Sequence, residues 1–373
     1  MSDTHVAALV GNGLSISVNN QMTLRSITTE VVARIGESDG DDVSVAMRGI
    51  ADRALPDGAG SDGDFEVLLG AFDAERRNLE LLEVLSAATG QRDDDELQQA
   101  IRRTARFAER VRDSGVSHAL EVIAERSRAN EESSGALREF VRAIVTEFTG
   151  DVSFGNLNYD TLLLASLLRE CKDEVADMGH GQLGGELTIA HDWSIAGYPL
   201  RQCADDFPAT HRVRLLHLHG SLAYWDDGTG THLKISRDRV TPELWRAVRD
   251  GNCSARPDVV LTTQHDKATA VEATPFRLPY EMFGTALRGS THWLIVGYSF
   301  RDAPVNKMLR ESFDGHELPK VLVITHGDSP TRSEVERALG WDPECDGNAN
   351  WLSIDREGAA GAHERHRWSR FVR

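Results

Sequence analysis

Hydrophobic positions at the start of the chain form a short continuous run that breaks into glycines. Residues 6–10 read VAALV, and Gly11-Asn12-Gly13 and two serines follow before a helical pattern begins. Such a run is typical of a buried parallel strand, and the glycines allow a tight turn and a close approach of backbone to a ligand. The pattern predicts a strand, a turn and a helix starting near Ser15, whose N-terminus would face an anion. A plain strand-to-helix turn is the alternative, since a dinucleotide fingerprint would carry a third glycine where Ile16 stands.

Apolar residues then recur at helical spacing. Four of them predict a first crossover helix that ends at Gly36: Leu24, Ile27, Val31 and Ile35. Residues 37–64 are rich in Asp, Gly and Ser and predict a mobile loop with little core of its own. Further helical stripes cover residues 65–72, 97–108 and 137–148. Because no strand pattern interrupts them, we expect residues 37–149 to form a loop plus a helical insertion or cap.

From residue 152 onward, short apolar runs alternate with helical stretches, as in a parallel sheet covered by helices. The expected strands are residues 152–157, 213–218, 259–263, 293–296, 321–325 and, more weakly, 351–354. Residues 170–257 show little periodicity and are expected to be irregular segments over the sheet or a small subdomain. The sequence therefore predicts an α/β fold with a Rossmann-like parallel sheet, helices on both faces and a helical insertion after the first βα unit. We expect one domain over residues 1–373.

Composition narrows the classes of function. No run approaches the ~18 apolar residues of a membrane span, and MSDTH lacks the pattern of a signal peptide, so a cytoplasmic protein without a membrane contact is expected. The net charge of −18 argues against a surface that holds nucleic acid. The basic tail AAGAHERHRWSRFVR is either a docking segment or a solvated end. The four cysteines lie far apart without a C-x-x-C pair, so neither a disulfide framework nor a zinc module is expected.

Polar residues follow the strand expected at 152–157. Asn158 and Asp160 stand where the strand ends, and open α/β sheets bind ligands at the carboxyl ends of their strands. Asn158 has the polar atoms to orient a water or a ribose hydroxyl. Asp160 stands where an N-cap would stabilise the next helix. A turn residue and a simple cap are the alternatives without a ligand.

The next strand ends in histidine and glycine. Period two puts His217 and His219 on one face. An H-x-H pair can bind a metal, but no Cys or carboxylate accompanies it at a recognisable spacing, so no metal is expected. His219, beside Gly220, is the candidate acid or base near neutral pH. His217 is expected to be structural.

A third segment, VGYSFRD, repeats the design of the first turn. Gly297 permits a close backbone approach, and Ser299 can donate to a phosphate or a ribose. Asp302 or Ala303-Pro304 is expected to open the next helix. The following strand closes with His326-Gly327-Asp328, which would form a wall for an adenine or a ribose. A capped turn without a ligand is the alternative.

Taken in order, GNGLS, NYD, LHG and GYSFRD resemble the sirtuin-like (SIR2-like) domain of bacterial NAD-consuming antiphage defence proteins. In sirtuins the corresponding segments are a GAG loop, the Asn and Asp of a Q-N-I-D element, a catalytic histidine before glycine and a G-T-S loop that holds ADP-ribose. The resemblance implies that Asn158 and His219 carry the chemistry. It implies that the following residues contact NAD: Gly11, Asn12, Gly13, Ser15, Asp160, Gly297, Ser299 and Asp302.

The resemblance also implies an activity. It implies an NAD+ glycohydrolase that cleaves the nicotinamide–ribose bond of its substrate NAD+ to give nicotinamide and ADP-ribose, as the effector of an antiphage (abortive infection) system that depletes NAD. Such proteins typically act as oligomers, and some pair with a sensor such as a HerA-type ATPase or an Argonaute, so a homo-oligomer with such a partner is expected. The lack of paired cysteines counts against a deacetylase built on the usual sirtuin plan.

Two other classes of function stay open. One is a regulatory module that binds NAD or ADP-ribose without catalysis, and the other is a sirtuin-type deacylase or ADP-ribosyltransferase. A dehydrogenase is disfavoured because the third glycine is missing and no hydride-transfer site is recognisable.

Overall fold

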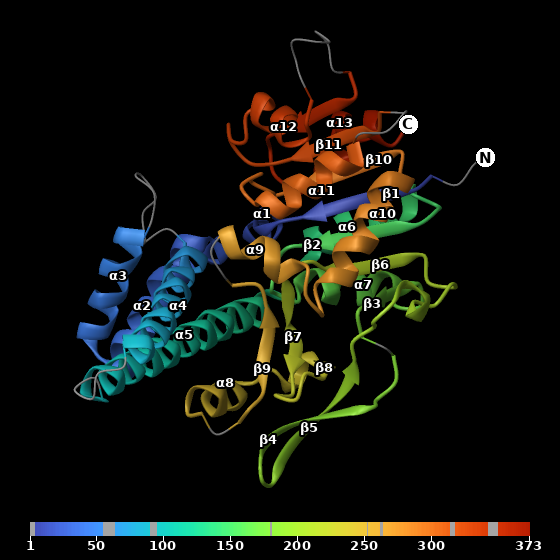
Figure 1. Cartoon of the computed structure of the whole chain (residues 1–373). Helices are drawn as coiled ribbons and strands as arrows, with labels where there is room; N and C mark the ends of the chain where they lie inside the picture. The colour runs from blue at the N-terminus through green and yellow to red at the C-terminus, as the bar shows by residue number, and fades with distance from the viewer. Residues whose placement is uncertain are drawn as a thin grey trace.

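A parallel sheet of seven strands forms the centre of the protein (Figure 1). The structure, a computed structural model, describes the chain except residues 1–3, 55–63, 90–94, 180, 252, 262–263, 314–317 and 342–349. In spatial order the strands are β12 (Leu352–Asp355), β11 (Lys320–Ile324), β10 (His292–Val296), β1 (Val6–Val10), β2 (Val152–Asn156), β6 (Val213–His217) and β3 (Val175–Asp177). Neighbouring strands pair in parallel, which confirms the predicted Rossmann-like α/β fold.

Helices cover both faces of this sheet because alternate residues of each central strand point to opposite sides. In β1, Val6 and Val10 pack into one layer, whereas Ala7 and Leu9 pack into the other. The first layer holds α1 (Asn12–Val18), α6 (Gly135–Glu147), α7 (Leu162–Cys171) and α13 (His366–Phe371). The second holds α10 (Arg277–Gly289), α11 (Ala303–Phe313) and α12 (Arg332–Ala338). Burial on both faces explains why the strands read as continuous apolar runs.

A second sheet, with five antiparallel strands, lies beside the first. Its order is β4 (Gly185–Ala190), β5 (Trp193–Pro199), β8 (His232–Ile235), β7 (Gly220–Asp226) and β9 (Arg256–Val259). The prediction of irregular segments over residues 170–257 is therefore wrong, and the alternative of a small subdomain is the one compatible with this sheet. The strand predicted at residues 259–263 is also wrong, because Val259 ends β9 of the second sheet and Val260 and Leu261 follow it outside any strand. Two short helices flank this region, α8 (Pro242–Arg249) and α9 (Gln264–Val271).

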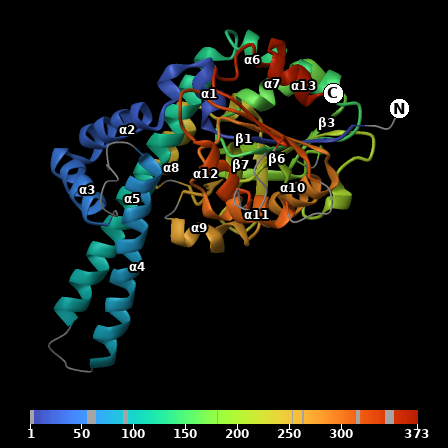
Figure 2. The same ribbon diagram turned by 90° about the horizontal axis from the view of Figure 1, so that it is seen from above.

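A helical insertion follows the first βα unit, as predicted, but its bounds differ from the predicted residues 37–149. It consists of α2 (Leu24–Asp39), α3 (Asp41–Ala54), α4 (Phe65–Thr89) and α5 (Asp95–Asn130). The helix α6, which the prediction included, packs instead on the parallel sheet. Figure 2 shows α4 and α5 as a long hairpin that projects from the body of the protein. The base of the insertion shares one core with the second sheet, in which Trp245 of α8 and Trp225 of β7 are buried.

Two predictions within the insertion need correction. The first helix runs on past Gly36 to Asp39, and Gly40, with a φ of 103°, follows it in a conformation that suits glycine. Part of the predicted mobile loop is the helix α3, whose first turn carries Asp41 and Asp42. Acidic residues stabilise the start of a helix through its dipole, so they are compatible with a helix here. The rest of the predicted loop, residues 55–63, lies outside the described residues.

The basic end of the chain is packed against the first helical layer. In α13, Trp368 and Phe371 are 3% and 4% exposed. The Trp368 ring lies 5.7 Å from that of Phe140 and 6.5 Å from that of Phe148. The expectation of a solvated end is therefore wrong for α13. Across the described ranges, no helix is both long and apolar enough to span a bilayer.

Candidate functional site

A cleft of about 810 Å³ opens at the carboxyl ends of the central strands. Segments that follow β1, β2, β6, β10 and β11 contribute to its lining. β1 lies between β2, the next strand of this sheet along the chain, and β10, which comes much later. The strand order therefore reverses beside β1. In an open α/β sheet this switch point is where ligands bind.

The two glycine loops of the cleft pack against each other through their backbones. The N–H of Gly11 donates to the carbonyl of Val296 at 2.9 Å, and the N–H of Gly13 donates to the carbonyl of Gly297 at 2.9 Å. A Cβ on Gly13 would stand 2.5 Å from the Cα of Gly297, which itself has a φ of +63°. Helix α1 begins at Asn12, before the predicted start near Ser15, and the Gly13 amide in its first turn is bonded within the protein. These glycines are needed for contact between the loops, although both loops line the cleft.

Asn158 sits at the floor of the cleft within a hydrogen-bond network. Its Nδ2 donates to the Gly11 carbonyl at 3.1 Å and to Ser15 Oγ at 3.0 Å. Ser15 Oγ in turn donates to Asp160 Oδ2 at 2.5 Å, and the N–H of Leu162 donates to Asp160 Oδ1 at 2.9 Å. Within the described part of the chain no group donates to Asn158 Oδ1, so this acceptor is available to the cleft.

Ser15 and Asp160 lie behind Asn158 and are not among the residues that line the cleft. Both are buried, with 2% and 3% of their surfaces exposed. Burial raises the pKa of Asp160, while the hydrogen bonds from Ser15 and Leu162 act to lower it. Asp160 therefore fixes the start of α7 and, through Ser15, the orientation of the Asn158 amide.

His219 lines the cleft beside Asn158 and is 4% exposed. Its Nε2 lies 3.2 Å from the hydroxyl of Tyr280 and 3.5 Å from Asp302 Oδ2. Burial, followed by the nearby Lys267 charge, lowers the pKa of His219 to about 4. The ring is thus neutral at pH 7 and can accept a proton. His217, in contrast, is 1% exposed and contacts Asn156 beneath the site, in keeping with a structural role.

A family model described as a SIR2-like domain matches residues 153–343. The chain belongs to the SIR2-like family. SIR2-like domains bind NAD and are compatible with NAD-utilising enzymes. No curated protein matches the chain.

The SIR2-like match contains Asn158, His219 and Gly297 but not the first glycine loop. The structure places that loop against Gly297, so the two parts form one cleft. Of the residues predicted to contact NAD, six line the cleft: Gly11, Asn12, Gly13, Gly297, Ser299 and Asp302. His326 also lines the SIR2-like cleft, as the predicted wall requires, whereas Asp328 is not among its lining residues.

A charged cluster that the sequence did not reveal stands beside His219. The Lys267 ammonium lies 3.0 Å from Asp302 Oδ2 and 3.1 Å from Glu66 Oε2, and Lys267 is 3% exposed. Glu66 also accepts a hydrogen bond from Tyr159 at 2.7 Å. Burial acts to raise the pKa of Glu66, but Lys267, His219 and the hydrogen bond from Tyr159 together keep that pKa below its usual value. Glu66 and Lys267 belong to none of the motifs that the sequence shows, whereas Asp302 belongs to GYSFRD.

The loop that carries Asp302 is held in a strained shape. Phe300 has a φ of 57°, which non-glycine residues rarely adopt. Asn306 Nδ2 donates to the Phe300 carbonyl at 2.8 Å, and Tyr298 donates to Asn306 Oδ1 at 2.8 Å. Asp302 Oδ1 accepts from the N–H of Val305 at 3.1 Å and so caps α11, as the sequence predicts. The cap leaves Asp302 Oδ2 to face Lys267 and His219.

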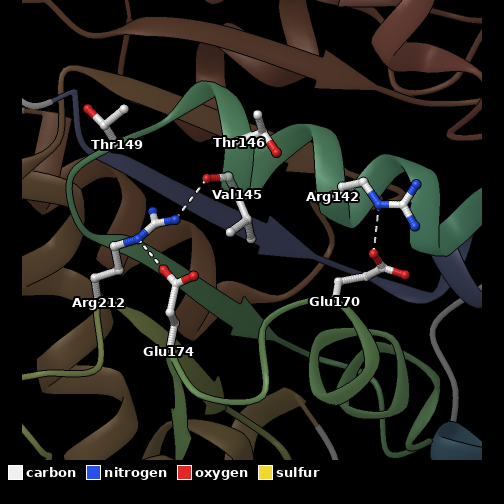
Figure 3. Close-up of a pocket in the computed structure, with 7 residues that line it drawn as sticks. All are labelled: Arg142, Val145, Thr146, Thr149, Glu170, Glu174 and Arg212. Atoms are coloured by element: carbon white, nitrogen blue, oxygen red, sulfur yellow. Dashed lines mark hydrogen bonds and ion pairs between the residues drawn. The ribbon is translucent and has the colours of Figure 1, made fainter.

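A second pocket, of about 340 Å³, lies near the amino ends of β2 and β6, away from the SIR2-like cleft. Figure 3 shows that its charged side chains pair with one another: Arg142 with Glu170, and Arg212 with Glu174 and the Val145 carbonyl. These contacts tie α6 to the segments around α7. In the ranges that the structure describes, no group of three or more His, Cys, Asp or Glu side chains could hold a metal ion.

Proposed function

We propose that the protein is an NAD+ glycohydrolase that releases nicotinamide and ADP-ribose. The observation that carries the proposal is that Asn158 and His219 both line the cleft, with an available amide oxygen on the first and a neutral imidazole on the second. An NAD-binding module without catalysis would need the glycine loops but not this pair.

Cleavage of the nicotinamide–ribose bond depends more on the orientation of the reacting groups than on a strong acid. The nicotinamide of NAD+ already carries a positive charge, and breaking its bond to ribose develops oxocarbenium character at the anomeric carbon. Asn158 Oδ1 accepts a hydrogen bond from a ribose hydroxyl or from the attacking water and fixes its position. His219 accepts the proton that this hydroxyl or water gives up.

Asp302 then faces the imidazolium that forms on His219. A carboxylate 3.5 Å from Nε2 stabilises the protonated ring, because opposite charges attract strongly where water is excluded. General-base catalysis of this kind contributes roughly 10²- to 10⁴-fold to the rate.

The resemblance also suggests the setting of the reaction. We propose a cytoplasmic effector of antiphage defence that depletes NAD, acting as a homo-oligomer and together with a sensor protein such as a HerA-type ATPase or an Argonaute. Exposed apolar side chains on the α4–α5 hairpin support a protein contact there: Leu81, Val84, Leu85 and Leu97.

The test is NAD loss and nicotinamide release, followed by chromatography without an acceptor, over a series of protein concentrations. We expect the wild type to release one nicotinamide per NAD consumed, and Asn158→Ala and His219→Ala to lose at least about 100-fold in rate. His191→Ala, which changes an exposed histidine in the turn between β4 and β5, is the matched control.

Three results would contradict the proposal. Variants that keep the wild-type rate would remove Asn158 and His219 from the chemistry. NAD binding without product at every concentration would favour the regulatory module. Nicotinamide release that depends on an added acceptor would favour a deacylase or an ADP-ribosyltransferase.

A further inference from the structure

A buried lysine faces His219 across a single carboxylate oxygen. Asp302 Oδ2 lies 3.0 Å from the Lys267 ammonium and 3.5 Å from His219 Nε2. On its other side Lys267 meets Glu66 Oε2 at 3.1 Å. The three charged residues come from α9, from α4 and from the loop before α11, so only the tertiary fold brings them together.

Such a cluster is expensive to bury. Moving a charged group out of water costs several kcal/mol per ion even after relaxation, and apolar residues of similar size are often as stable. Lys267 and Asp302 are 3% and 6% exposed, and the cluster consists of one ammonium and two carboxylates. Its net charge is therefore one negative unit, directed at the imidazole.

We propose that Lys267 is a positioning residue that, together with Glu66, sets the charge facing His219. The inference rests on the proposed function, in which His219 serves as the base. With Lys267 in place, one net negative charge faces the ring. The ring is neutral before the reaction, and this negative charge balances the positive charge that the ring gains when it accepts a proton. Without Lys267, two carboxylates would face the ring and hold it protonated beforehand.

The groups that face His219 come from several elements. Tyr280 of α10 contacts Nε2, and burial raises its pKa well above the usual value, so it remains neutral. Asp302 and Lys267 supply the nearest charges, and Glu66 the next. Asp64 stands beside Glu66, and burial raises the pKa of Asp64 to about 6. At pH 7, the charge balance at the ring is thus set mainly by Asp302, Lys267 and Glu66.

Glu66 connects the helical insertion to the charge balance at His219. It lies in the first turn of α4, which continues into the projecting hairpin (Figure 2). Tyr159, three residues before the start of α7, donates to its Oε1. A shift at the base of α4 that withdraws Glu66 would leave Lys267 and Asp302 balanced and lower the proton affinity of His219.

The experiment is an NMR titration of the histidine rings in the full-length protein without NAD, in which His219→Gln identifies the His219 signal. We expect the wild-type ring to stay neutral from pH 8 to pH 5. In Lys267→Met the ring should titrate inside that window, because its pKa rises by about 1–3 units. In the double variant Lys267→Met/Glu66→Gln one of the two carboxylates is neutral, and the pKa of the ring should fall below its value in Lys267→Met.

The matched control is Lys307→Met, which removes an exposed lysine of α11 that pairs with Glu311. Its titration should equal that of the wild type. Lys267→Arg, which keeps the charge, should also leave the ring neutral, and circular dichroism checks that each variant is folded. If Lys267→Met does not fold, Glu66→Gln and the double variant still test the charge balance. The pKa of the ring should be lower in Glu66→Gln than in the wild type, and higher in the double variant than in Glu66→Gln.

A ring that stays neutral in folded Lys267→Met, or that titrates in the double variant as it does in Lys267→Met, would overturn the inference. The pH profile of NAD cleavage separates it from the proposed function. If the wild type cleaves NAD, the acid limb of the Lys267→Met profile should move to higher pH by as many units as the pKa of the His219 ring rises. If the wild type cleaves no NAD but the rings titrate as expected, the proposed function fails and the charge balance at His219 stands.

Discussion

Single residues of the cleft are constrained in two ways, by backbone contact between loops and by side-chain hydrogen bonds. Gly11, Gly13 and Gly297 lack a Cβ because the loops after β1 and β10 touch through their backbones. Asn158 and Asp160 instead hold their places through side-chain hydrogen bonds that converge on Ser15. Both kinds of constraint fix the walls of the cleft before any ligand arrives.

Gly13→Ala should damage the cleft. The new Cβ would stand 2.5 Å from the Cα of Gly297, and backbone cannot move aside cheaply. We expect a loss of about 1–3 kcal/mol in the free energy of unfolding and a fall of at least about tenfold in NAD affinity. Urea denaturation and calorimetric titration with NAD measure the two effects.

Gly49→Ala is the control for this substitution. Gly49 lies in α3 with open space around its Cβ position, so the change should be neutral or stabilise the fold by up to about 1 kcal/mol. Equal behaviour of the two variants would show that contact between the loops does not constrain Gly13.

The sequence indicates some site residues and not others. Asn158 and His219 follow apolar strands, and the carboxyl ends of parallel strands meet at one edge, so their proximity is predictable. Glu66, Lys267 and Tyr280 lie within helices, where a polar residue is usually exposed. The folded chain brings these three to His219, and the spacing along the sequence contains no sign of it.

Among the elements, the strands of the parallel sheet are the ones that the sequence predicts best. They are buried on both faces, and their apolar runs are continuous. The second sheet escaped prediction because its strands are partly exposed and contain residues that weaken a strand signal, such as Gly197 in β5 and Pro257 in β9. The helix α3 escaped because its aspartates resemble a loop composition.

The short helix α13 contributes more stability than its length suggests. Trp368→Ala should lower the free energy of unfolding by about 3–5 kcal/mol, because it removes a ring buried against Phe140, Phe148 and Phe371. Chemical denaturation measures the loss. Arg370→Ala, which changes an exposed residue of the same helix, should cost less than about 0.5 kcal/mol. Similar values for both variants would mean that α13 does not pack as described.

For the molecule as a whole, buried neutral histidines link stability to pH. Burial lowers the pKa of His217, His219 and His292 to about 4. Below the unfolded value of about 6.5 the unfolded chain binds protons that the folded protein does not, so these residues destabilise the fold as the pH falls. Asp64, whose pKa burial raises to about 6, acts in the opposite direction.

His292→Gln isolates one of these contributions. The His292 ring lies 5.3 Å from that of Phe148 and 5.2 Å from that of Phe371, outside the cleft. Between pH 7 and pH 5 the stability of the variant relative to the wild type should rise by about 2 kcal/mol. Urea titrations of both proteins at the two pH values measure this difference. The other titratable groups are the same in the variant and the wild type, so their contributions cancel. A difference that stays constant between the two pH values would contradict the lowered pKa of His292.

The place of β1 between β2 and β10 has a consequence for how the protein is made. During synthesis, the glycine loop near residue 11 emerges first, yet the backbone against which it packs, at residue 297, emerges hundreds of peptide bonds later. A nascent chain, or a fragment left by a stalled ribosome or a premature stop codon before this point, lacks one wall of the cleft. Because residues 357–360 also line the cleft, a complete site exists only after translation has passed them as well.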